Sequence, residues 1–330
     1  MKDNRWIFVI PPDGAARTVA LNISDAFKTI IPIEYVKIFD TFKYLSAFRT
    51  MLKNPDPDTT VDLLNQTLVV SSLDFGTTHI LSGALSPLTL FTLNLLRKQG
   101  ITTIHWFYED YHKASYWKDV ISGYDHFCAI QKGILPSECQ KAGSKYHYLP
   151  TATSCVFQMQ QSERRFDIAF IGIPSPYRIS ILEHLACEGF HLLIAGSGWG
   201  AYEGILKKNI ISGTWVDNDI SFSLLNQSKI GLNISIENPS GRSDVHISPR
   251  AFDILASGCI LLTEKVPLID DTIPLCKYHT FSSIKDAVIK ADKILNNYQN
   301  ESITSKQNIE IITSQHTYKN RATDILNYLN

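Results

Sequence analysis

A cation and a carboxylate stand three residues apart in the segment 247–262, which reads I-S-P-R-A-F-D-I-L-A-S-G-C-I-L-L. They are Arg250 and Asp253, and Pro249 favours an extended approach before a short helix that contains both. Gly258 is suited to end that helix, because glycine adopts the left-handed backbone that often follows a helix. Backbone N–H groups at a helix N-terminus attract anions. A cation, a carboxylate and a helix N-terminus at one place therefore suit a diphosphate with a ribose beside it.

A second candidate phosphate contact lies earlier in the same half of the chain. The apolar residues 168–171 predict a strand, Gly172 follows it, and Arg178 stands at the start of a predicted helix, 179–187. The order strand, glycine, loop and helix is that of a phosphate-binding turn, although no G-x-G-x-x-G is present. We expect Arg178 to contact a pyrophosphate, or else to be a surface arginine.

Three further residues are candidates for the nucleotide site. Gly196 opens the glycine-rich loop 196–200 after a predicted strand, where a ligand can approach the backbone closely. Trp215 follows another predicted strand and either takes part in binding or fills the core. His246 ends the polar loop 237–246, so it either meets phosphate oxygens or belongs to a surface loop.

The first half carries its most reactive side chains in residues 105–116, H-W-F-Y-E-D-Y-H-K-A-S-Y. This run begins in a predicted strand, so Glu109 and Asp110 are expected on a loop at the carboxyl edge of a sheet, where α/β proteins bind ligands. A carboxylate there is suited to deprotonate an acceptor hydroxyl. The alternative is that these charges are only solvated, as loop charges often are.

The first predicted strand, residues 6–10, ends in Pro-Pro-Asp-Gly. Asp13 and Gly14 are therefore acceptor-side candidates, with a plain tight turn as the alternative. Asp74 and His79 are weaker candidates for a base. Neither the histidine spacing nor any D-x-D at a strand end resembles a metal site, so no metal is expected.

Alternating strands and helices must position these residues. Apolar runs predict strands that include 67–71 and 101–108 in the first half and 230–236 in the second, with helices between them. This alternation is typical of an α/β fold with parallel sheets. The polar run 154–165 is expected to link two domains, 1–155 and 166–317. The last helix, about 318–330, is expected to pack back on the first domain.

Four segments of the second half resemble the glycosyltransferases of the two-Rossmann-domain GT-B type, and especially the spore-maturation-protein-like family. They are F-D-I-A-F-I-G with Arg178 after it, I-S-G-T-W-V at 211–216 followed by S-K-I-G-L-N-I-S at 228–235, the helix and strand at 250–262, and Q-H-T-Y-K-N-R-A at 315–322. The resemblance implies two Rossmann-like domains facing across a cleft. It also implies that the second domain binds a nucleotide-diphosphate sugar through Arg250, Asp253 and Arg178, with residues 211–216 beside the base.

The activity implied is transfer of the sugar to a hydroxyl-bearing acceptor such as a glycan, a glycolipid or a protein glycan, with no separate cofactor. The chain departs from the family pattern at Asp253, where glutamate is usual. Two alternatives stay open, another GT-B activity such as a nucleotide-sugar epimerase, and a non-catalytic nucleotide- or glycan-binding protein.

Composition excludes several other classes of protein. The chain has 330 residues, 44% hydrophobic and 19% charged, with a formal net charge of −1, so no basic field attracts nucleic acid. No apolar run approaches the ~20 residues that span a bilayer, although peripheral membrane contact stays open. The six cysteines form no C-x-x-C pair and are expected to be reduced thiols in the cytoplasm.

Overall fold

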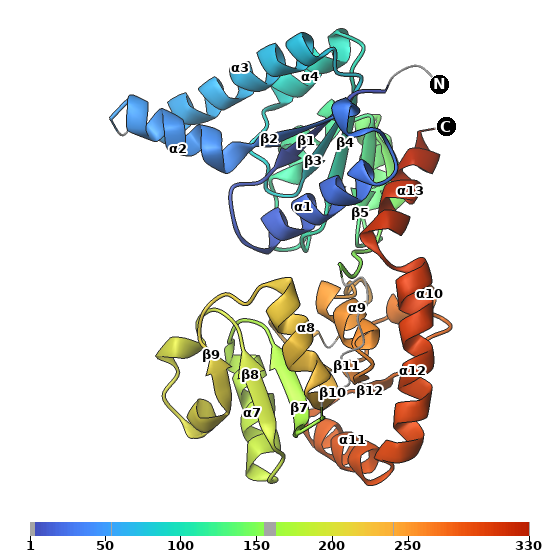
Figure 1. The fold of residues 1–330 in the computed structure, drawn as a ribbon. Coiled ribbons are helices and arrows are strands. Elements are labelled where there is room, and N and C mark those ends of the chain that lie inside the picture. The colour runs from blue at the N-terminus through green and yellow to red at the C-terminus, as the bar shows by residue number, and fades with distance from the viewer. Residues whose placement is uncertain (1–3, 54, 155–162, 240, 330) are drawn as a thin grey trace. The chain divides into compact units, whose positions relative to one another are not determined.

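A computed structural model describes residues 4–53, 55–154, 163–239 and 241–329 of the chain (Figure 1). The chain divides into two compact units, one formed by Met1–Thr151 with Tyr318–Asn330 and the other by Ala152–Thr317. Each unit contains one six-stranded sheet in which every pair of neighbouring strands is parallel. The α/β architecture predicted from the sequence is confirmed. Most of the predicted linker, 154–165, lies outside the described residues.

In the first unit the strand order is β2-β1-β3-β4-β5-β6. Its strands are β1 (Trp6–Ile10), β2 (Val36–Asp40), β3 (His79–Gly83), β4 (Thr102–Phe107), β5 (His126–Ala129) and β6 (Lys145–Tyr148). Its helices are α1 (Gly14–Lys28), η1 (Ile33–Tyr35), α2 (Thr41–Met51), α3 (Pro57–Phe75), α4 (Leu90–Lys98), α5 (Trp117–Val120), η2 (Ile121–Gly123), α6 (Leu135–Ala142) and α13 (Tyr318–Tyr328). Strand β1 is buried at every residue, as expected for a strand covered on both faces.

The strand predicted at 67–71 is wrong, because these residues lie inside helix α3. The Asp56 side chain accepts a hydrogen bond from the N–H of Thr59 at 2.9 Å and so caps the helix start. Leu64 and Leu68 are fully buried one turn apart, whereas Val70 is 67% exposed. Burial at helical spacing over 19 residues outweighs the strand preference of a short β-branched run.

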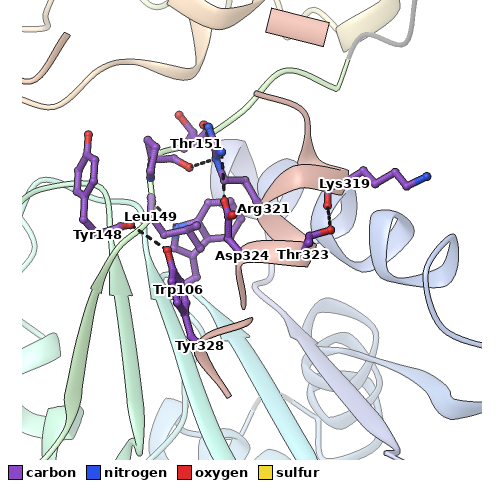
Figure 2. Close-up of polar contacts among 10 residues, drawn as sticks. Trp106, Tyr148, Leu149, Thr151, Lys319, Arg321, Thr323, Asp324 and Tyr328 are labelled. Atoms are coloured by element: carbon purple, nitrogen blue, oxygen red, sulfur yellow. Dashed lines mark hydrogen bonds and ion pairs between the residues drawn. The ribbon is translucent and has the colours of Figure 1, made fainter. Parts of the chain in front are cut away.

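Helix α13 ends the chain but packs against α1 of the first unit. Arg321 is 4% exposed, and its Nε donates to the carbonyls of Pro150 and Thr151 at 2.8 and 3.2 Å (Figure 2). The hydroxyl of Tyr328 donates to the Tyr148 carbonyl at 3.3 Å. These bonds tie α13 to the last residue of β6 and to the residues that follow it.

In the second unit the strand order is β12-β11-β10-β7-β8-β9. Its strands are β7 (Phe166–Ile171), β8 (Leu192–Ala195), β9 (Ile210–Ser212), β10 (Ser228–Asn233), β11 (Ile260–Glu264) and β12 (His279–Phe281). Its helices are α7 (Pro176–Cys187), η3 (Trp199–Ala201), η4 (Ile205–Asn209), α8 (Asn218–Asn226), α9 (Pro249–Ala256), α10 (Ile269–Thr272), α11 (Ile284–Asn296) and α12 (Tyr298–Gln315).

Both sheets have a point at which the strand order reverses. In the first sheet it lies between β1 and β3, and in the second between β7 and β10. Ligands of open α/β sheets bind at the carboxyl ends of the strands beside such a point. Binding groups are therefore expected on the loops that follow β1, β3, β7 and β10.

Candidate functional site

Helix α9 brings Arg250 and Asp253 to the carboxyl edge of the second sheet, where the chain returns after β10. The Ser248 side chain accepts a hydrogen bond from the Arg250 N–H at 3.1 Å, and Pro249 is the first helical residue, so both the cap and the proline favour a helix start here. Gly258, with φ of +70°, follows the helix as predicted. The apolar side of α9 is buried, which leaves Arg250 and Asp253 on the outer side, 23% and 16% exposed.

These two predicted ligand-binding side chains contact each other. Arg250 Nη1 lies 3.1 Å from Asp253 Oδ2, and the hydroxyl of Thr153 donates to Asp253 Oδ1 at 2.8 Å. Burial raises the pKa of the Asp253 carboxyl, while the charge of Arg250 and the Thr153 hydrogen bond act in the opposite direction. Sequence reasoning missed Thr153, because no local pattern marks a residue that meets its partner 100 positions later.

Gly172 and Gly196 lie against each other at the carboxyl ends of β7 and β8. A Cβ atom on Gly196 would come within 2.4 Å of the Gly172 carbonyl oxygen, and Gly196 has φ of +139°. That oxygen also accepts a hydrogen bond from Trp199 Nε1 at 2.7 Å. Only glycine permits this close approach, so the two predicted glycines fix the shape of the edge beside the switch point.

Trp215 is 51% exposed just beyond β9, and its indole N–H donates to Asp217 at 3.1 Å. Of the two interpretations of this residue, exposure excludes filling of the core. His246 is half-buried between the buried Val245 and Ile247, close before α9 in the chain.

The Arg178 side chain is hydrogen-bonded to main-chain carbonyl groups. Its guanidinium donates to the carbonyls of Ile173, Ile234 and Ser235 at 2.7–3.2 Å and lies over the Phe170 ring. Burial lowers its pKa to about 10, an effect partly offset by the Glu264 carboxylate, so the side chain stays charged at neutral pH. The surface-arginine alternative is therefore excluded, while the pyrophosphate contact stays a prediction.

In the first unit, Glu109 and Asp110 follow β4 at the carboxyl edge, as predicted. Asp110 Oδ1 accepts hydrogen bonds from the His112 N–H at 3.1 Å and from Gln131 Nε2 at 3.3 Å, so it holds its own turn. Glu109 is half-buried and has no hydrogen-bond partner for its carboxylate among the described residues. Burial, and then the charge of Asp110, raise the Glu109 pKa. A carboxylate with a raised pKa is the better suited of the two to accept a proton.

Asp13 and Gly14 lie at the switch point of the first sheet and are exposed. Asp13 precedes α1 without capping it through its side chain, and Gly14 has φ of +65° with open space where a Cβ would lie. Sequence reasoning missed the adjacent pair Arg17 and Asp40, which is bidentate at 2.8 and 2.7 Å. The pair was missed because α1 and β2 were not predicted.

The weaker candidates Asp74 and His79 lie at the wrong edge. His79 is the first residue of β3, and Asp74 precedes it at the end of α3, so both are on the amino side of the sheet. The β3 loop on the carboxyl side instead presents Leu85, which has φ of +63° and is 46% exposed. Its N–H donates to the Tyr116 hydroxyl at 2.8 Å, which holds this unusual backbone in place.

The part of the chain that the structure describes contains neither a metal-binding cluster nor a membrane-spanning helix. No group of three or more histidine, cysteine or acidic side chains within the described residues is arranged to hold a metal ion. None of their helices has the length and apolar character needed to span a bilayer.

The chain resembles known proteins in sequence over much of its second half and in fold over nearly its whole length. Residues 178–327 match a family model described as glycosyl transferase-like. No curated protein sequence matches the chain. Solved structures do, and a glycosyltransferase from Rickettsia africae has a TM-score of 0.68 at 10% identity, covering 99% of this chain and 98% of that one.

Two more structures match over similar lengths. Sucrose-phosphate synthase from Thermosynechococcus elongatus has a TM-score of 0.66 at 11% identity, covering 99% of this chain and 98% of its own. The Anabaena protein HepE, determined in complex with UDP and glucose, has a TM-score of 0.65 at 10% identity and 99% coverage of both chains. Residues 178–327, which comprise most of the second unit and most of α13, are therefore glycosyl transferase-like, and the chain as a whole has the fold of GT-B glycosyltransferases.

Proposed function

We propose that this protein transfers a sugar from a nucleotide-diphosphate donor to a hydroxyl-bearing acceptor, and that α9 holds the donor. The observation that carries the proposal is the pairing of Arg250 with Asp253 at the N-terminal end of that helix, inside the glycosyl transferase-like match. A positive charge and unpaired helix N–H groups suit a diphosphate, and a neighbouring carboxylate suits ribose hydroxyls.

The same groups explain how the reaction is accelerated. Negative charge develops on the diphosphate as the bond to the sugar breaks, and a fixed cation beside it stabilises the transition state. In our proposal Arg250 supplies that charge, with His246 as a second contact and Gly172 and Gly196 giving the donor access to the backbone. Exposed Trp215 flanks the base. Because HepE was determined with UDP, we take uracil as the first base to test.

We further propose that Glu109 removes the proton from the acceptor hydroxyl if the reaction inverts the sugar configuration. Its raised pKa and unengaged carboxylate support Glu109 over Asp110, whose carboxylate is engaged in its own turn. Asp13 and Gly14, at the switch point of the first sheet, line the acceptor side in this scheme.

The remaining features of the proposal rest on sequence. The narrower likeness to the spore-maturation-protein-like glycosyltransferases rests on the four segments quoted above. We propose that the transfer reaction needs only the donor and the acceptor, without a separate cofactor or metal. We also propose that the enzyme acts in glycan biosynthesis and that it works in the cytoplasm. The last point rests on the absence of a paired-cysteine pattern in the sequence.

The experiment is a thermal-shift screen of the wild-type protein against UDP, GDP, ADP and CDP, followed by release assays with the corresponding nucleotide sugars. A ligand that binds only the folded state raises the melting temperature by mass action. At a concentration 100 times its dissociation constant, such a ligand adds about 2.7 kcal/mol to the free energy of unfolding. Binding with sugar release supports the enzyme. Binding without release or transfer would favour a non-catalytic binding protein, isomerised sugar would indicate an epimerase, and no binding would overturn the proposal.

A further inference from the structure

Two loops flank the switch point of the second sheet, residues 172–175 after β7 and residues 234–236 after β10. The second of these leads directly into the polar loop that precedes α9. The conformation of residues 234–236 therefore sets where that loop starts. Three side chains from outside this segment, those of Ser175, Arg178 and Glu264, form hydrogen bonds with its backbone.

Arg178, on α7, holds it through its carbonyls. Nη2 and Nε donate to the Ile234 carbonyl at 2.7 and 3.1 Å, and Nε is shared with the Ser235 carbonyl at 3.2 Å. Nη1 donates to the Ile173 carbonyl at 2.9 Å. One planar guanidinium thus ties the β7 loop to the β10 loop, a geometry that the compact ammonium of a lysine cannot reproduce.

Glu264, the last residue of β11, holds the segment through its N–H. Its Oε2 accepts from the Ser235 N–H at 2.5 Å, and the side chain is 3% exposed. Ser175 adds a third tie, because its hydroxyl donates to the Ile236 carbonyl at 2.7 Å. Carbonyls and an N–H of the same three residues are therefore bound by side chains that converge from α7, its N-terminal cap and β11.

We propose that Arg178 and Glu264 are positioning residues for the donor. They fix residues 234–236, and thereby the start of the loop that leads to α9, in the arrangement that accepts the nucleotide sugar. This inference rests on the proposed function. It assigns Arg178 a role through the backbone, in place of direct contact with the pyrophosphate.

Charge and geometry can be separated at Glu264, and Arg178→Lys keeps the charge while removing the planar geometry. Glu264→Gln removes the charge but keeps an oxygen that accepts from the Ser235 N–H, whereas Glu264→Asp keeps the charge and withdraws that oxygen by one methylene. We expect Glu264→Asp and Arg178→Lys each to weaken UDP binding by roughly tenfold or more, the scale of one lost charge-assisted hydrogen bond. Glu264→Gln should bind UDP within about threefold of the wild type. The glutamine oxygen keeps the hydrogen bond to the Ser235 N–H, and only the difference in strength between a charged and a neutral acceptor is lost.

The double variant Arg178→Lys with Glu264→Asp provides the decisive measurement. If both side chains act on one segment, the combined loss of UDP affinity by calorimetry is much smaller than the product of the two single losses. Direct phosphate contact by Arg178 predicts that the losses multiply, since a buried carboxylate does not bind phosphate. Melting temperatures of every variant show whether the affinities refer to folded protein, and Glu264→Leu replaces Glu264→Asp if that variant does not fold.

The outcomes are distinct. Wild-type protein that binds no nucleoside diphosphate overturns the proposed function, and this inference with it. Wild-type protein that binds UDP, with Glu264→Asp unchanged, with multiplying losses, or with lowered melting temperature and unaltered affinity, overturns the inference alone.

Discussion

The Asp253 carboxylate accepts a hydrogen bond from the Thr153 hydroxyl at 2.8 Å while Arg250 lies 3.1 Å from its other oxygen. Thr153 forms a bridge with Thr317, and its N–H donates to the His316 carbonyl at 2.9 Å, so this hydroxyl is carried by a short pairing of two distant chain segments. The acid expected at the ribose is thus held by a cation from its own helix and a hydroxyl from far along the chain.

Replacing Arg250 with alanine is expected to weaken UDP binding by about 1.5–3 kcal/mol, the value of hydrogen bonds to charged groups, with little change in fold. The physical reason is loss of the phosphate contact together with the partner of Asp253. Calorimetric titration measures it, with Lys285→Ala, an exposed cation on α11, as the control. Equal UDP affinity in the Arg250 variant and the control would remove Arg250 from the donor site.

Thr153→Val should raise the Asp253 pKa further, because the hydroxyl favours the charged carboxylate. Ribose hydroxyls donate to the carboxylate form, so UDP affinity is expected to fall as pH drops through this pKa. In the variant that loss should begin at a higher pH, and Thr153→Ser should restore the wild-type profile. The measurement is UDP affinity against pH for the three proteins, and superimposable profiles would count against a role for Asp253 at the ribose.

Glu109→Gln is expected to reduce turnover by roughly 10²–10⁴-fold, the usual contribution of a positioned base, while donor affinity stays the same. Asp110→Asn should have a smaller effect on turnover and should lower the melting temperature, because Asp110 holds the turn with His112 and Gln131. Rates and melting temperatures of both variants check this. If both keep wild-type turnover, the base lies elsewhere, with Asp13 next, or the reaction retains configuration.

Gly231→Ala should destabilise the protein by about 1–3 kcal/mol, as overpacking of a filled core does. A Cβ atom there would lie 2.4 Å from Ile254 Cγ2 on α9, so the helix that carries Arg250 must move. We therefore expect weaker UDP binding as well. Gly200→Ala is the matched control, since its added Cβ meets nothing closer than 3.8 Å. Equal stability of the two variants would show that α9 does not press on β10 at Gly231.

Acid should destabilise the first unit through His147. Burial, then His126 and Lys145, lower the His147 pKa from 6.5 to about 4. The unfolded chain takes up a proton at His147 below about pH 6.5, whereas the folded chain takes it up only near pH 4. The contribution of His147 to the free energy of unfolding is therefore complete above pH 6.5 and is lost as the pH falls between those two values. His147→Phe keeps a ring against Tyr328, which stacks at 4.1 Å. Its melting temperature should fall less between pH 7.5 and 5 than that of the wild type, and an equal fall would refute the assignment.

The sequence by itself determined the elements whose signals are local. Residues 250–262 contain a proline, a helical apolar face, a glycine and an apolar strand, and these fix α9 and β11 wherever they are packed. The same holds for the loops after β1, β4 and β7, so Asp13, Glu109 and Gly172 were placed at strand ends without the structure. Alternation of such elements was enough to predict two parallel sheets.

Only the tertiary structure decided which side chains meet. The β-branched run at 67–71 became helix because its neighbours on α3 bury one face at helical spacing, a long-range effect invisible in five residues. Arg178 binds carbonyls 56 and 57 residues away, and Glu264 reaches the Ser235 N–H because β10 and β11 are neighbours in register. Partners so far apart leave no periodic trace in sequence, since their encounter is fixed by strand order and packing.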